Sequence, residues 1–251
     1  MTILGVLGCV SLLLLALGIR DTINHVALSV YEETFNYQQK LELNEATITA
    51  EFLQQVTENE FAEFIEERLV FISSQETAKS SFIRIIEDHS ETINFYNDGN
   101  RLFPQLHDVL ITRRTAEIYG LEVGDTLEFR AESKEIIRLE VSHIIPINIG
   151  QGIYLTQSTW EYLGQAFNPT SILAQNEANI GLTEYIQNTT ETHLQRAEFL
   201  DSMNSTLSML LILAASLLLL VVLYNLGVLN FADRERNLAT LSVLGCLNIQ
   251  N

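Results

Sequence analysis

The sequence is poor in cysteine and in proline. Its two cysteines, Cys9 and Cys246, stand near opposite ends of a chain of 251 residues. The long stretch between them therefore cannot hold a disulfide framework, which favours a bacterial over a eukaryotic surface protein. The three prolines are spread over the middle of the chain: Pro104, Pro146 and Pro169. We expect them to mark loops, because proline interrupts helices and central strands.

Positive charge is also scarce and unevenly placed. The chain has 14 Lys and Arg against 32 Asp and Glu, a formal net charge of −18. No charged residue precedes Arg20, and none lies between Asp201 and Asp233. The middle, with 11 basic and 30 acidic residues, carries a formal charge of −19. Such a segment repels nucleic-acid phosphates, so we expect no DNA or RNA partner. Solubility is the simplest reason for the excess of acidic residues, although this segment would also attract basic peptides or cations.

Motifs of nucleotide-binding and hydrolytic proteins are missing. No Gly-x4-Gly-Lys-Ser/Thr loop and no Gly-x-Ser-x-Gly elbow occurs, which excludes these two devices. The histidines do not pair with each other or with cysteine at metal-ligand spacing: His25, His89, His107, His143 and His193. Adjacent acids such as Glu32 and Glu33 read as a solvated face. We therefore expect no catalytic residue, cofactor or metal site, and predict that the chain is not an enzyme.

Long apolar runs, in contrast, are present at both ends. Met209 to Val228 is a run of 20 residues without charge, and a helix of that length spans about 30 Å, the hydrocarbon core of a bilayer. Ala214, Ala215 and Ser216 interrupt the leucines, as at helix contacts in membranes. A buried helix of a soluble protein is the alternative, but a helix apolar on every face favours a membrane span.

The first apolar run, Thr2 to Ile19, is shorter and has a second interpretation. A secretory signal peptide is usually basic before its apolar stretch and ends at a small-x-small site. This run has no preceding basic residue and only a weak match at Ala16-Leu17-Gly18. We therefore expect a transmembrane helix here, while cleavage as a signal peptide stays open.

The flanking charges predict the orientation. Arg234 and Arg236 follow the second run closely, whereas Glu198 and Asp201 precede it. Because basic flanks stay inside, the C-terminal end is predicted to be cytoplasmic. The sequence then predicts a multi-pass protein of the bacterial cell membrane with residues 21 to about 203 extracytoplasmic. Arg20, on the outer flank, argues mildly against this orientation.

The middle of the chain has the pattern of an α+β domain. Alternating or β-branched runs predict strands at 38–43, 68–73, 82–87, 109–112, 126–130, 135–145 and 153–156. Helices are predicted at 22–38, 49–56, 58–66, 115–119 and 156–163, and a turn at Asn97–Asn100. Apolar residues then recur at helical spacing from Leu182 to Met203 without a glycine or proline before the second run. This pattern predicts a helical stalk that continues into the membrane.

The last segment predicts a short amphipathic helix. It reads LYNLGVLNFADRERNLATLSVLG from Leu223 to Gly245. Asp233 and Glu235 suit the start of a helix and Gly245 suits its end. Leu238, Leu241 and Leu244 form its apolar part, which would lie at the inner membrane face.

This segment resembles FtsX-like, or MacB-type, permeases of bacterial ABC transporters. In that family a membrane helix is followed by Glu-Arg-x-Arg-Glu-Leu-Ala-Thr-Leu-Lys-Val-Leu-Gly. The matching residues are Arg234, Arg236, Leu238, Ala239, Thr240, Leu241, Val243, Leu244 and Gly245. Segments 18–23, 109–112 and 121–126 are similar to other parts of the family, less specifically. The chain departs from the pattern at Asp233, Asn237 and Ser242, and the last two remove charges that could contact an ATPase.

The resemblance implies a permease subunit or fragment without its own ATPase. A separate cytoplasmic ABC ATPase subunit would dock on Asp233, Arg234, Glu235, Arg236, Leu238, Leu241, Leu244 and Gly245. Hydrolysis would move the extracytoplasmic domain, for export or for mechanotransmission. The resemblance also implies a second permease copy or a missing permease half, because family members continue into at least two further membrane helices; this chain is then a truncated module. Membrane lipid is the remaining expected partner.

These expectations divide the chain into five parts. They are transmembrane helix 1 (1–20), an α+β extracytoplasmic domain (21–181), a helical stalk (182–205), transmembrane helix 2 (206–230) and a cytoplasmic coupling helix with the truncated end (231–251). A membrane-tethered sensor or adaptor that binds a ligand outside the cell is the alternative function. The short tail after the second span is evidence against it, because a sensor needs an output domain.

Overall fold

The computed structural model describes residues 2–44, 48–59, 61–73, 78–97, 99–130, 136–175 and 185–243. The chain divides into two compact units. Unit 1 consists of Met1–Asn24 and Leu200–Asn251, and unit 2 of His25–Phe199. Two long helices belong to both units: α1 (Thr2–Leu28) and α5 (Thr192–Val243).

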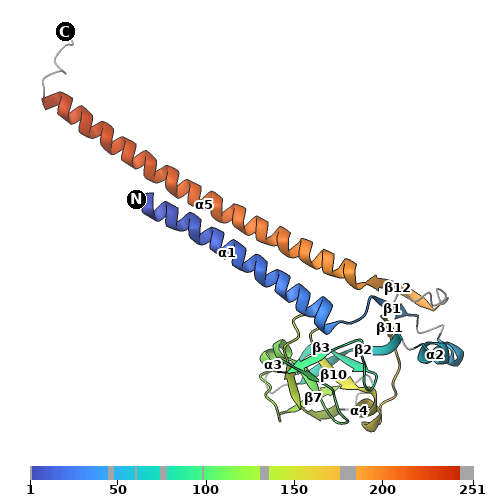
Figure 1. The fold of residues 1–251 in the computed structure, drawn as a ribbon. Helices are drawn as coiled ribbons and strands as arrows, with labels where there is room; N and C mark the ends of the chain where they lie inside the picture. The colour runs from blue at the N-terminus through green and yellow to red at the C-terminus, as the bar shows by residue number, and fades with distance from the viewer. Residues whose placement is uncertain are drawn as a thin grey trace. The chain divides into compact units, whose positions relative to one another are not determined.

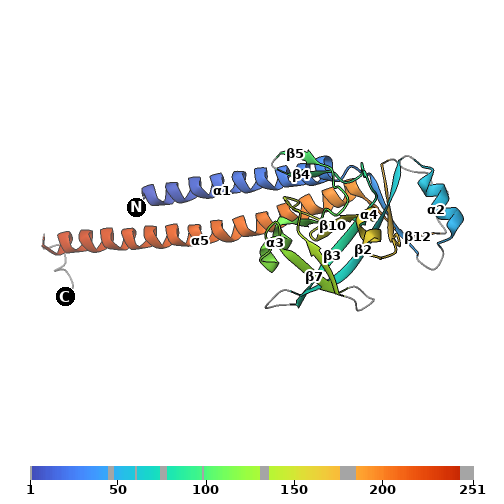
Figure 2. The ribbon, with the colours of Figure 1, turned by 90° about the horizontal axis from the view of Figure 1, so that it is seen from below.

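Unit 1 is a pair of apolar helices. Its portions of α1 and α5 lie side by side in both views (Figures 1 and 2). They approach closely at Gly8, where an added Cβ would lie 2.9 Å from Leu218 Cδ1. By length and composition, two helical segments could cross a membrane: Val10–Thr34 and Thr192–Val228. Their leucines are largely exposed within the chain, as expected for side chains that face lipid.

Unit 2 is an α+β domain built on a ten-stranded sheet. The main path runs β12-β1-β11-β2-β3-β10-β6-β9, and β7 pairs with β2 and β8. The strands are β1 (Gln39–Leu43), β2 (Ala62–Ser73), β3 (Ala78–Ile86), β6 (Leu110–Thr112), β7 (Thr126–Arg130), β8 (Ile136–Glu140), β9 (His143–Ile145), β10 (Ile153–Thr156), β11 (Ser171–Ala174) and β12 (Ile186–Glu191). A separate hairpin joins β4 (Phe95–Asn97) to β5 (Asn100–Leu102).

The long strand β2 organises this sheet. It pairs with β3 from Ile65 to Ser73, with β11 near its start and with β7 near its end. One arm, β12-β1-β11, therefore leaves the first part of β2, and the hairpin β7-β8 leaves its last part. Successive residues of a strand point to opposite faces, so Ile72 enters one core with Ile83 and Phe129, while Ile65 enters another.

Short helices cover the ends of the sheet. They are α2 (Ala50–Thr57), α3 (Arg113–Tyr119) and α4 (Gln157–Tyr162). The Thr49 and Thr156 side chains accept hydrogen bonds from Phe52 N–H and Thr159 N–H and so cap α2 and α4. Helix α2 lies beside the β12-β1-β11 arm (Figures 1 and 2). There Phe52 and Val56 form a third core with Leu41 and Phe64.

Most of the expected strands are confirmed. Strands β7 and β10 have the predicted bounds, and β1, β3 and β6 differ by a few residues. The predicted strand 135–145 is divided into β8 and β9 at Val141 and Ser142. The expected turn at Asn97–Asn100 joins β4 to β5, with Gly99 at a φ of 80°, a conformation that favours glycine.

The predicted helix at 58–66 is wrong. Residues Ala62–Ser73 form β2, although Ala and Glu favour helices. The pairing with β3 and β11 supplies hydrogen bonds on both edges of β2, and its apolar residues complete two cores. This tertiary pairing outweighs the local preference.

Three boundaries at the helix ends also differ from the expectation. The predicted stalk includes 186–191, but these residues form β12, and α5 begins only at Thr192; residues 182–184 lie outside the described residues. The predicted helix at 22–38 is confirmed as far as Thr34, because α1 continues to Leu28 and is followed by a π-helix, η1 (Ser29–Thr34); only Phe35 to Gln38 are not helical. In the described part of the tail, the expected short helix is continuous with the second span, because α5 runs through Asp233 to Val243 without a break.

Candidate functional site

The residues that the sequence indicated for ATPase docking lie at the end of α5. Asp233, Arg234, Glu235, Arg236, Leu238 and Leu241 all belong to this helix, and Leu244 and Gly245 lie outside the described residues. Leu238 is 57% exposed, and it follows Arg234 by four residues, about one helical turn. The arrangement thus presents an exposed apolar side chain with a cation one turn before it.

The other end of α5 is held by the sheet domain. Strand β12 pairs antiparallel with β1 and leads directly into α5, whose first N–H, at Thr192, donates to Gln38 O at 2.8 Å. Arg196 forms an ion pair with Glu32 of η1. The rings of Tyr31 and Phe199 have centroids 6.2 Å apart. We call these contacts the root contacts, because they join the beginning of α5 to the end of the first helix.

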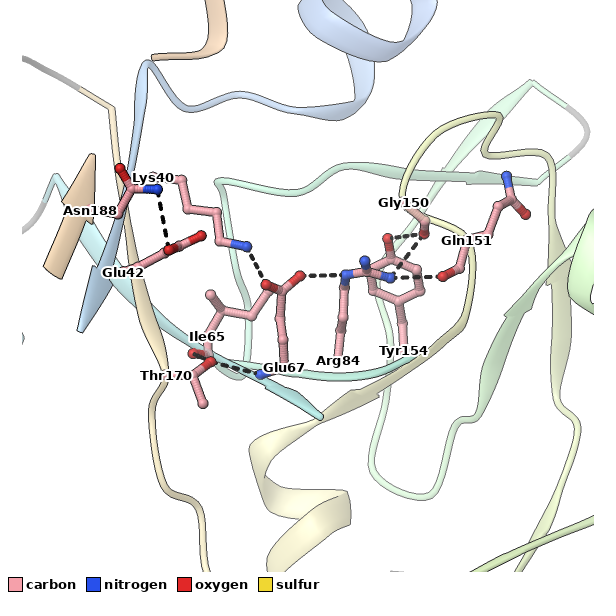
Figure 3. A network of polar contacts seen from close by, with 10 residues as sticks. All are labelled: Lys40, Glu42, Ile65, Glu67, Arg84, Gly150, Gln151, Tyr154, Thr170 and Asn188. Atoms are coloured by element: carbon pink, nitrogen blue, oxygen red, sulfur yellow. Dashed lines mark hydrogen bonds and ion pairs between the residues drawn. The ribbon is translucent and has the colours of Figure 1, made fainter. Parts of the chain in front are cut away.

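A network of polar side chains crosses the sheet next to this region (Figure 3). Glu67 of β2 is its centre: its carboxylate pairs with Lys40 of β1 and accepts from Arg84 Nε of β3 at 2.7 Å. Arg84 Nη1 also donates to the carbonyls of Gly150 and Gln151, at 3.1 and 3.0 Å. The network therefore connects β1, in the arm that carries α5, to β2, β3 and the loop before β10.

Tyr154 completes the network from β10. Its hydroxyl donates to Gly150 O at 2.7 Å, and the Arg84 guanidinium lies 5.4 Å from the centre of its ring. The two residues are direct neighbours because β10 runs parallel to β3 in a register that pairs Tyr154 with Arg84. A cation over an aromatic face is stabilised by the ring quadrupole, so Arg84 is held by charge, hydrogen bonds and an aromatic ring.

The charges of the network shift its pKa values. Burial alone would raise the pKa of Glu67, but Lys40 and Arg84 outweigh burial and lower it. Burial likewise would lower the pKa of Arg84, and the neighbouring Tyr154 and Glu67 raise it instead. Burial raises the pKa of Tyr154 and of Tyr37, which lies near the same charges. At neutral pH the network therefore consists of two cations, one carboxylate and neutral phenols.

The amino-acid sequence alone did not indicate this network. Its one signal is the charge of Arg84, which interrupts the apolar run of β3 between Ile83 and Ile85. Charged residues inside a buried strand require a partner, but the partner comes from a strand 17 residues away in the chain. The pairing register that joins them is a tertiary property.

Neither metal ligands nor sequence relatives point to a particular chemistry. Over the described ranges, no group of three or more His, Cys, Asp or Glu side chains could hold a metal ion. No protein-family model and no curated protein matches the sequence.

Two solved structures are similar to part of the chain. One is the extracellular domain of the noncanonic ABC-type transporter YknZ from Gram-positive bacteria, with a TM-score of 0.40 and 12% identity, covering 59% of this chain and 87% of that one. The other is a domain of a protein described as a permease, from Porphyromonas gingivalis, with a TM-score of 0.32 and 13% identity, covering 57% of this chain and 73% of that one. Neither TM-score reaches 0.5, and the function proposed for this chain rests on its own residues.

Proposed function

We propose that this chain is a permease subunit or fragment of a bacterial ABC transporter of the FtsX-like, MacB type. A separate cytoplasmic ATPase subunit docks on the segment from Asp233 to Gly245. Its hydrolysis cycle moves the extracytoplasmic sheet domain through α5, for export or for mechanotransmission. Lipid surrounds the apolar helices, and a second permease copy or a further permease half completes the assembly.

One observation carries this proposal: the described part of the docking segment, Asp233 to Val243, and the α5 residues of the root contacts belong to one helix. Helix α5 continues from Thr192 to Val243 without interruption. It has no proline, and its only glycine is Gly227. Proline is a common cause of sharp kinks in helices, and α5 lacks it. We propose that a displacement at the docking segment is passed along this helix to the sheet domain.

The domain end of the helix is built to receive such a displacement. Helix α5 begins at Thr192, the residue that directly follows the last residue of β12. Strand β12 pairs with β1 from Gln39 to Leu43. The Lys40 side chain of β1 then pairs with Glu67 of β2. Main-chain and charged contacts thus lead from the first turn of α5 into the centre of the sheet, with no flexible linker between them.

The tail residues supply the second line of support. Nine residues agree in order with the permease pattern, and they directly follow an apolar run that can span a membrane. A short apolar patch with basic neighbours fits a groove on a partner protein, as amphipathic helices commonly do. The departures at Asn237 and Ser242 reduce the charge of the patch, so the leucines carry most of the expected contact.

The decisive experiment replaces one of these leucines. The tagged full chain is purified in mild detergent from its own host, and the ATP hydrolysis that co-purifies with it is measured. Leu241→Asp places a charge within the docking face, and we expect it to reduce the associated ATPase at least tenfold, a loss of about 1.4 kcal/mol of binding free energy.

Val123→Asp is the matched control. Val123 is 60% exposed on the sheet domain, so the same charge is added far along the sequence from the docking segment. We expect the control to retain the ATPase of the unchanged chain. Equal ATPase recovery from all three proteins would show that the segment does not dock an ATPase.

A further inference from the structure

A pocket of about 350 Å³ lies between η1 and the first turn of α5, inside unit 2. Two parts of the chain that are distant in sequence line it: Tyr31 of η1 with the nearby Tyr37 and Gln38 before β1, and Thr192, His193 and Arg196 of α5. The pocket is thus built where the root contacts are made.

Several polar groups of the pocket are left without a hydrogen bond to the described part of the chain. Thr192 is 7% exposed, and its Oγ1 has no partner there. The half-buried Tyr31 and Tyr37 side chains and the exposed Gln38 side chain also form no hydrogen bond with described residues. Leaving a buried polar group unpaired costs about 1–3 kcal/mol, and the buried Thr192 hydroxyl, in the lining of a pocket with these further polar groups, indicates a ligand that supplies its partner.

The pocket is richer in donors than in acceptors. Helix α5 begins here, and the N–H groups of its first turn give this end a partial positive charge. Arg196 adds a cation, and burial keeps the Tyr37 hydroxyl protonated by raising its pKa. Carboxylates near the pocket already have partners: Glu32 pairs with Arg196, and Glu191 Oε2 lies 3.2 Å from His193 Nε2.

We propose that this pocket binds a phosphate group. A phosphate presents oxygens in three dimensions, which suits donors arriving from η1, from the β1 approach and from α5, whereas a carboxylate presents its oxygens in one plane. Helix N-termini with arginine are well suited to phosphate. The phosphate belongs either to a water-soluble molecule or to a lipid headgroup.

The bound phosphate competes with Glu32 for Arg196. Both are anions, and the guanidinium would be shared or transferred to the ligand. The ion pair that joins η1 to α5 would then weaken while the ligand itself bridges the two. Occupancy of the pocket would in this way change how firmly the two helix roots are joined, independently of any ATPase.

The test measures binding to the full chain in detergent. Inorganic phosphate is titrated in a phosphate-free buffer and followed by calorimetry, with saturable 1:1 binding as the expected result. Arg196→Gln should weaken this binding at least tenfold, and Tyr37→Phe, which removes a single hydroxyl, severalfold. The matched controls, Arg138→Gln and Tyr162→Phe, change exposed residues elsewhere in unit 2 and should bind as the unchanged chain does.

A second arm separates the two sources. Mixed micelles that contain phosphatidylglycerol are compared with glycerol 3-phosphate, the soluble equivalent of the headgroup. Binding of the soluble compound supports a free phosphate ligand, and binding of the micelles alone, lost in Tyr37→Phe, supports a headgroup. The proposal is overturned if neither probe saturates, or if Tyr37→Phe, checked by circular dichroism for an unchanged fold, binds both probes as tightly as the unchanged chain.

Discussion

The Glu67 carboxylate of β2 links strands β1 and β3 of unit 2 through ion pairs. Its carboxylate is shared by Lys40 and Arg84, which come from β1 and β3, and its own N–H donates to Thr170 Oγ1 at 2.9 Å. The side chain is only 20% exposed. Removing its charge would leave two partly buried cations without a counter-ion, which is costly.

We predict that Glu67→Gln lowers the free energy of unfolding by about 3 kcal/mol, the usual cost of breaking a buried ion pair. The measurement is urea unfolding of the full chain in detergent, followed by fluorescence of Trp160, the single tryptophan. Glu128→Gln is the matched control, because Glu128 pairs with the largely exposed Arg138 and should cost less than about 1 kcal/mol. Equal losses in both variants would contradict the central role of Glu67.

We also predict that Glu67→Gln changes how the free energy of unfolding depends on pH. The pKa of Glu67 in the folded domain lies below its ordinary value of 4.5. Its charge therefore stabilises the fold above that pH, and this contribution is lost as the pH falls from about 4.5 through the lowered folded pKa. In Glu67→Gln the unfolding free energy should fall less steeply over this acidic range. Parallel pH curves for the two proteins would argue against the assignment.

At the scale of elements, the start of β10 depends on a close backbone approach. Gly152 has a φ of 150°, and an added Cβ would lie 2.2 Å from Phe82 O of β3. Its N–H donates to Thr112 Oγ1 at 3.2 Å, and its carbonyl accepts from Thr112 N–H at 3.0 Å. Only glycine allows β10 to join β3 and β6 in this way.

We predict that Gly152→Ala destabilises unit 2 by more than about 2 kcal/mol, since it combines a clash with an unfavourable φ. Gly164→Ala is the comparison, because Gly164 has a φ of 75° but open space around it, and it should cost about 1 kcal/mol. Thermal unfolding followed by circular dichroism measures both. A smaller loss for Gly152→Ala than for Gly164→Ala would refute the packing argument.

At the scale of the whole molecule, the charge distribution predicts which units face which side of a membrane. Arg234 and Arg236 should lie in the cytoplasm, and the acidic domain outside it. The apolar parts of α1 and α5 are long enough to cross the bilayer. Orientation, unlike the fold, depends on a membrane and is testable only in cells.

We predict that a single cysteine at Asn188→Cys reacts with a membrane-impermeant maleimide on intact cells. A cysteine at Glu235→Cys should react only after permeabilisation. Both variants are made with Cys9 and Cys246 replaced by serine, so that the unsubstituted background reports any unspecific labelling. Labelling of Glu235→Cys on intact cells would reverse the proposed topology.

The two apolar helices and many strands could be read from the chain itself. Apolar runs without charge identify long helices because hydration of each side chain is a local property. The alternation of β7 likewise indicates which of its side chains are buried. The scarcity of cysteine in the same way argued against a disulfide framework, and the scarcity of basic residues argued against a nucleic-acid partner. The segment proposed to dock an ATPase could be singled out for the same reason, since its residues are contiguous.

The remaining strands, the charged network and the pocket depend on tertiary contacts. Residues 58–66 and 186–191 have helical patterns, but β2 and β12 form there because neighbouring strands satisfy their backbone hydrogen bonds. The charged network and the pocket at the helix roots join residues that lie far apart in sequence, such as Glu32 and Arg196. Such contacts depend on strand register and on where two helices meet, and no local pattern of side chains contains that information.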